Sequence, residues 1–377
     1  MINSQVIFVL DEFLGPVNGT EAQFWLLYNA LAANTTWPKV ATLRHSQYLT
    51  DRLPADIYEN LSIGSLFSLS SLRKAFQFAR RARNAGVKVA HLYLNDVSIL
   101  LPAFLWLVGI RVIVSRRDLG FWYSKPILRV LRVQRHFVAR VIANCAAVKT
   151  AVIAAEGYRD TEVPVFLNGV EPPLIINPGT YRQDFGVPAN AVVLGMVANL
   201  RKLKRVDDAI HAIAGLKSQG LDAWLMVAGD DRVEEGVSQR AALAELAAKL
   251  GVQDRVRFVG MINPSWSFLA EIDVFLSCSD TEGLSNSIIE AMICKKPVIG
   301  TNVGGTPELI IHESSGFLYE PADVKALTEY AALLVFNKNL RSAMGRAGSD
   351  FAERTLSTRA LLAAHLALYG QLSGGRA

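Results

Sequence analysis

The chain has 377 residues, of which 51% are hydrophobic and 19% are charged, and this balance excludes a disordered or fibrous protein. At about 150 residues per domain, the length predicts two domains. Three cysteines stand far apart, at positions 145, 278 and 294. This spacing excludes a disulfide framework, and without a Cys-x-x-Cys pair or clustered histidines we expect no structural metal site.

Positive charge is concentrated in the first half of the chain. Residues 1–170 hold 19 lysines and arginines against 11 acidic residues, whereas the whole chain has a net charge of +5. Within residues 125–140, five basic side chains recur every three to five positions among apolar ones. Such a helix either exposes a solvated face or lies on anionic lipid, and both interpretations stay open. A nucleic-acid partner is not expected, because no aromatic residues are interleaved as in known modules.

Short apolar segments alternate with helix-length segments throughout the first half. Because these segments are apolar on both faces, they predict a parallel sheet that is covered by helices on both sides. We expect strands at residues 6–10, 39–43, 89–94, 112–115, 140–143 and 163–167.

The most apolar stretch, residues 97–110, is 14 residues long, whereas a membrane span needs about 20. We expect a buried or surface-docking helix there. The first ten residues lack the basic start of a signal peptide. The prediction is a cytoplasmic protein, with peripheral binding to the cytoplasmic face of the membrane left open.

Prolines and glycines interrupt the alternation at residues 173–190, which predicts a linker. The predicted domains are 1–172 and 191–354, with 355–377 forming a helix that returns to the first domain. The fold class is therefore α/β, with two doubly wound Rossmann-like domains, and ligands are expected at the carboxyl ends of the strands, in a cleft between the domains. In the second domain we expect strands at 192–197, 223–228, 256–259, 274–277 and 297–300.

The segment from Glu282 to Glu290 follows one of these strands and opens a helix. Gly283 permits close approach of a ligand, and free N–H groups at the helix start can hold phosphate. The alternative is that Ser287 and Glu290 form a plain capping box.

Three further loops have chemistry suited to an anion. The segment from Gly304 to Glu308 places two glycines before a helix start, although, taken by itself, a well-capped tight turn explains it better. Residues 201–205 hold four cations, which would neutralise a diphosphate leaving group or be solvated at the surface. In the first domain, residues 15–21 form a glycine-containing loop between a strand and a helix, which is a weak signal by itself.

Taken in order, these segments resemble the GT-B glycosyltransferases, in particular the retaining group called family 4. The resemblance covers nearly the whole chain. It is carried by the paired glutamates, the glycine loop that follows them, and the segments Asn168-Gly169-Val170, Val227-Ala228-Gly229-Asp230 and Asp273-Val274-Phe275.

The resemblance implies a hexosyltransferase-type enzyme that moves a sugar from a nucleotide-diphosphate-sugar donor to a glycan or lipid-linked acceptor in polysaccharide or glycoconjugate biosynthesis. Retention at the anomeric carbon, and the absence of a metal or other cofactor, are implied with it. Glu282 would contact the donor sugar, with Lys204 and Arg201 holding the diphosphate. The donor-binding residues carried over are Gly19, Thr20, Asn199, Gly283, Leu284, Ser285, Asn286 and Glu290.

The sequence departs from the family at two positions. Asn199 stands where relatives often have arginine, so the cationic role falls to Arg201, two residues later. Tyr93 stands where many relatives have histidine; its hydroxyl could bond a sugar but cannot act as a base near neutral pH. His91, two residues before, is expected to be structural.

Acceptor recognition is expected from the first domain, where Arg117 and Asp118 precede a run of aromatic residues. An Arg–Asp pair with an aromatic plug explains this loop equally. Two other functions remain: a GT-B sugar-nucleotide epimerase, and a noncatalytic protein that binds nucleotide sugars or glycans. A dehydrogenase is disfavoured, because no Gly-x-Gly-x-x-Gly motif opens either domain.

Overall fold

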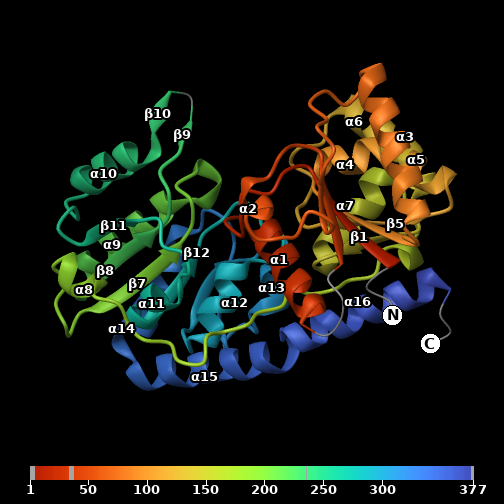
Figure 1. The fold of residues 1–377 in the computed structure, drawn as a ribbon. Coiled ribbons are helices and arrows are strands. Elements are labelled where there is room, and N and C mark those ends of the chain that lie inside the picture. Colours follow the sequence, from red (N-terminus) through yellow and green to blue (C-terminus); the bar gives the residue numbers. More distant parts are fainter. Residues whose placement is uncertain (1–4, 34–37, 235, 375–377) are drawn as a thin grey trace. The chain divides into compact units, whose positions relative to one another are not determined.

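The computed structural model describes residues 5–33, 38–234 and 236–374. The chain divides into two compact units. The first unit comprises Met1–Gly169 together with Ser357–Ala377, and the second unit comprises Val170–Leu356 (Figure 1). The final helix thus belongs to the first unit.

The first unit is built on a six-stranded parallel sheet in the order β3-β2-β1-β4-β5-β6. The central strand β1 is buried along its whole length, and its Phe8 pairs with Val40 on one side and His91 on the other. The strands are β1 (Val6–Leu10), β2 (Lys39–Thr42), β3 (Tyr58–Asn60), β4 (Val89–Tyr93), β5 (Arg111–Arg116) and β6 (Arg140–Ala143).

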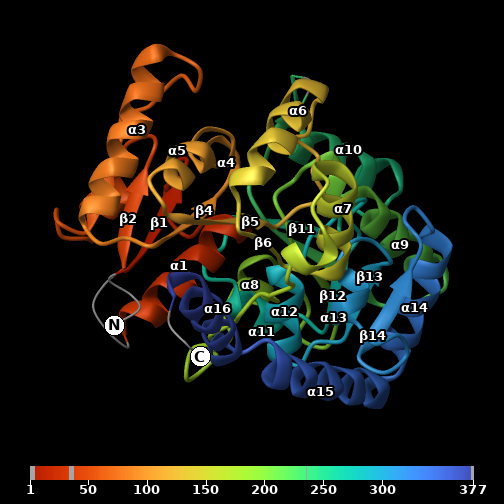
Figure 2. The ribbon, with the colours of Figure 1, turned by 90° about the vertical axis from the view of Figure 1, so that its right-hand side faces the viewer.

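Helices cover this sheet, and α1 (Gly19–Ala32) packs beside the last helix, α16 (Thr358–Ser373) (Figure 2). Leu361, Leu368 and Tyr369 of α16 join the apolar core around β1. The other helices of the unit are α2 (Gln47–Thr50), α3 (Leu69–Asn84), α4 (Asn95–Leu100), α5 (Pro102–Leu107), α6 (Lys125–Gln134) and α7 (Ala146–Glu156), with 3₁₀ turns η2 (Arg135–Phe137) and η3 (Asp160–Glu162).

The second unit repeats the architecture, with a parallel sheet in the order β11-β8-β7-β12-β13-β14. Its strands are β7 (Val192–Val197), β8 (Ala223–Ala228), β11 (Val256–Gly260), β12 (Val274–Ser277), β13 (Val298–Thr301) and β14 (Gly316–Tyr319), and a small hairpin is formed by β9 (Val233–Glu234) and β10 (Val237–Ser238).

The helices of the second unit pack on this sheet, and its core lies between β7, β8 and the helices α9 and α14. The helical elements are α8 (Tyr181–Asp184), η4 (Lys202–Lys204), α9 (Val206–Ser218), α10 (Gln239–Lys249), α11 (Trp266–Glu271), α12 (Asn286–Ile293), α13 (Thr306–Leu309), α14 (Val324–Phe336) and α15 (Lys338–Thr355).

Two segments differ from the sequence-based expectation. Residues 163–167 form no strand; Val165 makes one isolated bridge to Ala143, since Pro164 has no N–H to continue a ladder. Residues 97–110 form parts of two short helices that break at Pro102, the first residue of α5. No helix within the described ranges is long and apolar enough to cross a membrane.

The segment expected as a linker, residues 173–190, is anchored to the second unit. Arg182 donates hydrogen bonds to the carbonyl of Glu271 at 2.7 Å and to the carboxylate of Asp273 at 2.6 Å. The N–H of Arg182 also donates to the Glu271 carboxylate at 2.7 Å. These contacts fix the entry to β7.

Candidate active site

The carboxyl ends of β7 and β12 bring together a lysine and a glutamate. Lys204 ends the 3₁₀ turn after β7, and Glu282 lies on the loop between β12 and α12; the ammonium and the carboxylate are 2.7 Å apart. Both side chains are largely buried, at 24% and 16% exposed. The two loops are also joined by their backbones, since the N–H of Asp280 donates to the carbonyl of Leu203 at 2.9 Å.

The glycine loop after β13 packs directly on the loop that carries Glu282. Gly304 has φ +53°, and a Cβ atom there would lie 1.7 Å from the carbonyl oxygen of Glu282. The N–H of Gly305 donates to the carbonyl of Gly283 at 2.9 Å. Glycine at 304 is therefore required both for its backbone conformation and for this close approach. The two motifs found separately in the sequence form one structural element.

Glu290 lies inside α12, and a serine that precedes another helix binds it. The hydroxyl of Ser265, just before α11, donates to the Glu290 carboxylate at 2.5 Å. Burial raises the pKa of Glu290. The helix is capped instead by Ser285, which accepts from the N–H of Ile288 at 3.4 Å. A capping box between Ser287 and Glu290 is therefore not what the structure contains.

Among the cations at 201–205, Lys204 contacts Glu282. Arg201 instead lies 3.5 Å from Glu234 of the β9–β10 hairpin. It lines a separate pocket of about 380 Å³ with Lys202, Arg205, Gln239 and Leu243 among others.

Arg205, which the sequence analysis did not single out, has φ +47° and clamps Asp208 with two bonds of 2.6 and 2.8 Å. Asn199 accepts a hydrogen bond from the N–H of Asp230 at 3.4 Å. The side chain of Leu284 is buried, and Asn286 is the first residue of α12. The cluster that the second unit assembles thus holds Lys204, Glu282 and the glycine backbone, without Arg201.

The other predicted residues lie in the first unit. Gly19 and Thr20 open α1, whose preceding Asn18 bonds Glu21 at 3.1 Å. Tyr93 is 1% exposed, so its hydroxyl lies within the core and is not presented at the surface. Ser115, with which Tyr93 shares a hydrogen bond, is also within 2.8 Å of His91 Nε2.

His91 is a structural histidine. Its Nδ1 lies 2.7 Å from the Tyr369 hydroxyl of α16, and burial lowers its pKa well below the usual range.

The loop after β5 does not contain the expected Arg–Asp pair. Asp118 accepts from the N–H of Gly120 at 2.7 Å. Arg116 pairs with Glu156 of α7 through two bonds of 2.7 and 3.1 Å. Arg117 donates to the side chain of Asn168.

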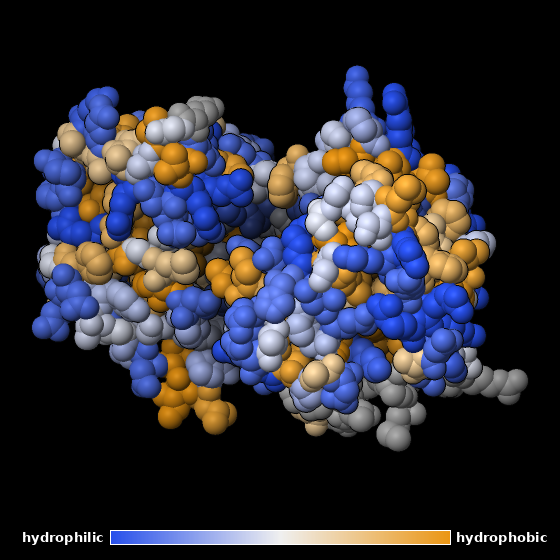
Figure 3. Space-filling model, turned by 45° about the horizontal axis from the view of Figure 1, so that its top comes forward, coloured by the Kyte–Doolittle hydropathy of each residue, from blue (hydrophilic) through white to orange (hydrophobic). Residues whose placement is uncertain are grey.

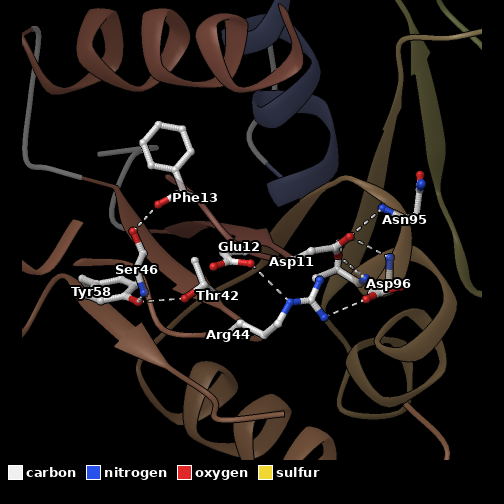
Figure 4. Close-up of polar contacts among 10 residues, drawn as sticks. Asp11, Glu12, Phe13, Thr42, Arg44, Ser46, Tyr58, Asn95 and Asp96 are labelled. Carbon is white, nitrogen blue, oxygen red and sulfur yellow. Dashed lines mark hydrogen bonds and ion pairs between the residues drawn. The ribbon is translucent and has the colours of Figure 1, made fainter. Parts of the chain in front are cut away.

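A charged cluster at the ends of β1, β2 and β4 was missed by the sequence analysis (Figure 4). Asp11, directly after β1, accepts the N–H groups of Asn95, Asp96 and Val97 at 2.8–3.0 Å. Burial is the main cause that raises the pKa of Asp11 to about 6. Arg44 bonds Asp96 at 2.9 Å and lies 3.6 Å from Glu12.

The start of α4 is therefore already occupied by the protein's own carboxylate. The signal available in the sequence was the acidic pair directly after the first strand, at the edge of the sheet where parallel strands end.

Comparison with known proteins finds relatives of the second unit. Residues 179–351 match the family described as Glycosyl transferases group 1. N-acetyl-alpha-D-glucosaminyl L-malate synthase of Bacillus anthracis is 32% identical over 164 residues, which are 44% of this chain and 41% of that protein. The capsular polysaccharide biosynthesis glycosyltransferase CapM of Staphylococcus aureus is 28% identical over 44% of this chain and 43% of its own length. The chain thus spans under half the length of these two relatives.

Solved structures show the fold over almost the whole chain. HepE of Anabaena, in complex with UDP, has a TM-score of 0.83 and 21% identity and covers 97% of this chain and 100% of its own. A glycosyltransferase from Rickettsia africae ESF-5 has a TM-score of 0.82 and 18% identity, with coverages of 97% and 98%. The class that the fold defines is GT-B: two Rossmann-like α/β domains with parallel sheets, as the sequence predicted. The matched family segment lies inside the second unit.

Proposed function

We propose that the protein is a retaining glycosyltransferase of family 4 that transfers a sugar from a nucleotide-diphosphate-sugar donor to a glycan or lipid-linked acceptor. The observation that carries the proposal is the contact between Lys204 and Glu282. The loop that carries Glu282 packs closely against Gly304. The match of residues 179–351 to glycosyltransferases supports it, because the whole of this cluster lies within that segment.

In the proposed mechanism, the second unit stabilises the leaving diphosphate. Lys204 has three N–H donors, so it can bond Glu282 and a phosphate oxygen together. As the bond between sugar and phosphate breaks, negative charge develops on the diphosphate, and a fixed ammonium in a partly buried site lowers the energy of that state. We propose that this cation takes the role that a metal ion has in other transferases.

Glu282 and Glu290 have different tasks in this proposal. Glu282 orients Lys204 and contacts the donor sugar. Glu290, with one oxygen held by Ser265, bonds the ribose hydroxyls. Arg201 is engaged by Glu234, so the proposal assigns the diphosphate to Lys204 and the backbone N–H groups of the Gly283 loop.

Binding of the donor is the first experiment. We would measure the thermal shift of the purified chain with UDP-, GDP-, ADP- and CMP-sugars, each with and without EDTA, starting with UDP-sugars because HepE was solved with UDP. A donor that binds only the folded state at a hundred times its Kd stabilises it by about 2.7 kcal/mol. We expect one nucleotide to produce a shift that survives EDTA.

Matched variants test the residues. K204A and E290Q should reduce the donor-induced shift, whereas K325A and E245Q, both on exposed helix faces, should leave it unchanged. Binding without sugar transfer to any acceptor would support a noncatalytic protein. A wild-type chain that none of the four nucleotides stabilises contradicts the proposal.

We also propose that the first unit touches an anionic membrane surface during the reaction. Trp106 and Leu107 of α5 are 50% and 64% exposed, and Trp106 packs on Phe137, which follows the basic helix α6. Figure 3 shows apolar patches beside hydrophilic ones on the first unit, at the right. Sedimentation with phosphatidylglycerol vesicles, but not with phosphatidylcholine vesicles, is the expected result, and W106S should weaken it.

A further inference from the structure

Arg117 is a cation without a carboxylate partner in the part of the chain that the structure describes. It follows β5 directly, and its guanidinium donates to the side-chain oxygen of Asn168. The neighbouring carboxylate, Asp118, is engaged by the N–H of Gly120. Asn168 is a neutral amide, so the charge of Arg117 is not balanced by it.

The residue before Arg117, Arg116, is an arginine whose charge is neutralised by a carboxylate. Successive residues of a strand point to opposite faces, and Arg116 turns to the other side, where Glu156 binds it with two hydrogen bonds. Ser98 accepts a third bond from Arg116 at 3.0 Å. Of these two consecutive arginines, Arg116 therefore has a carboxylate partner and Arg117 has a neutral amide.

Two buried histidines lie close enough to Arg117 to be affected by its charge. The charge of Arg117 contributes to the low pKa of both His91 and His365, after burial as the main cause. Burial lowers the pKa of Arg117 itself. Arg117 is partly buried, and a cation that is partly removed from water is costly unless an anion pairs with it.

The guanidinium is also held in place. Asn168 is buried, and the next residue, Gly169, exchanges two hydrogen bonds with the Gln23 side chain of α1, at 2.8 and 2.9 Å. Arg117 lies at the carboxyl end of its strand, the edge where doubly wound sheets bind ligands. A guanidinium fixed in this way can present its fork of donors to a planar or tetrahedral oxyanion.

We propose that Arg117 binds an oxyanion, a phosphate or a carboxylate, on the acceptor substrate. The inference rests on the proposed function and deepens it, because it restricts the acceptor to an anionic class. It assigns to Arg117 a binding role on the acceptor and no contact with the donor nucleotide.

Inorganic phosphate is the first probe, with malonate as the carboxylate arm. Binding to the full chain would be measured by calorimetry at constant ionic strength, for the wild type, R117Q, R117K and R111Q. Arg111 is an exposed arginine at the other end of β5, so R111Q removes the same charge at a distance from Arg117. Loss of a charge-assisted bond predicts about tenfold to a hundredfold weaker binding in R117Q, an intermediate loss in R117K and none in R111Q. The arm that binds more tightly identifies the anion.

K204Q separates this site from the proposed donor site. We expect K204Q to retain phosphate binding at Arg117, and R117Q to retain the thermal shift with a nucleotide sugar. Phosphate binding that R117Q leaves intact, or that K204Q alone abolishes, overturns the inference while the donor shift still supports the proposed function. If the chain binds phosphate through Arg117 but binds no nucleotide sugar, the anion site at Arg117 is supported and the proposed function is refuted.

The unfolding midpoint of each variant shows whether a loss of binding comes from a loss of folded protein. R117Q removes an unbalanced charge, so its unfolding midpoint in phosphate-free buffer should equal or exceed that of the wild type. An R117Q chain that unfolds more easily while R117K is unaffected would show that Arg117 is structural, and would overturn the inference.

Discussion

Replacing Arg116 by a neutral residue should destabilise the first unit, because the substitution leaves a buried carboxylate without its cation. Arg116 and Glu156 are 5% and 1% exposed, and Tyr123 is the remaining hydrogen-bond donor to Glu156. Breaking a buried pair from one side costs about 3–5 kcal/mol. We therefore expect R116Q to reduce the free energy of unfolding of the first unit by that amount, a large part of the stability of a domain at about 5–15 kcal/mol.

Hydrogen–deuterium exchange is the suitable assay, since the two units can open separately and a single unfolding curve would mix them. Protection of β5 and α7 should fall at least about a hundredfold in R116Q, at 1.4 kcal/mol per factor of ten. R81Q is the control: Arg81 lies 2.5 Å from Glu59, but the side chains are 55% and 41% exposed. Exposed pairs contribute about 0–1 kcal/mol. Equal losses of protection in R116Q and R81Q would refute the argument from burial.

Two other predictions concern single positions. G304A should lower the free energy of unfolding of the second unit by about 2–4 kcal/mol, through overpacking and a left-handed backbone, because the new Cβ would meet the Glu282 carbonyl. The control in urea unfolding is G64A, whose Cβ would meet nothing within 4 Å. Equal unfolding midpoints of the two variants would contradict the prediction. Burial lowers the pKa of His365 to about 4, so its contribution to stability is complete above pH 6.5 and is lost as the pH falls toward 4. That loss is about 2 kcal/mol at pH 5, and unfolding between pH 7 and 5 should depend less on pH in H365Q than in the wild type or in the exposed control H211Q.

The sheets could be predicted because their strands are apolar on both faces. The sequence placed β7 and β12 at the bounds that the structure has, 192–197 and 274–277. It missed β3, a three-residue edge strand of intermediate burial, and β14, which begins with a glycine. The segment 163–167 looked like a strand because its apolar content outweighs one proline, and yet that proline is enough to prevent a ladder.

The candidate site could be predicted to the level of loops but not of side chains. Strand ends could be assigned to one edge of the sheet, which places Lys204 and Glu282 on neighbouring loops. Arg201 pairs with Glu234, about thirty residues later in the chain, and Lys204 is left to contact Glu282. Glu234 lies on a hairpin that the sequence does not predict. In the same way, the partner of Glu290 is a serine before α11, and no spacing rule connects the two.

The position of α16 has a consequence for synthesis on the ribosome. The second unit is one continuous stretch, Val170–Leu356, whereas the core of the first unit is completed by Tyr369 and its neighbours on α16. At about 5–20 residues per second, translation of the second unit takes about 10–40 s. During this time the apolar faces of α1 and β4 lack their covering helix. The first unit is therefore the first to emerge from the ribosome and the last to reach its native core.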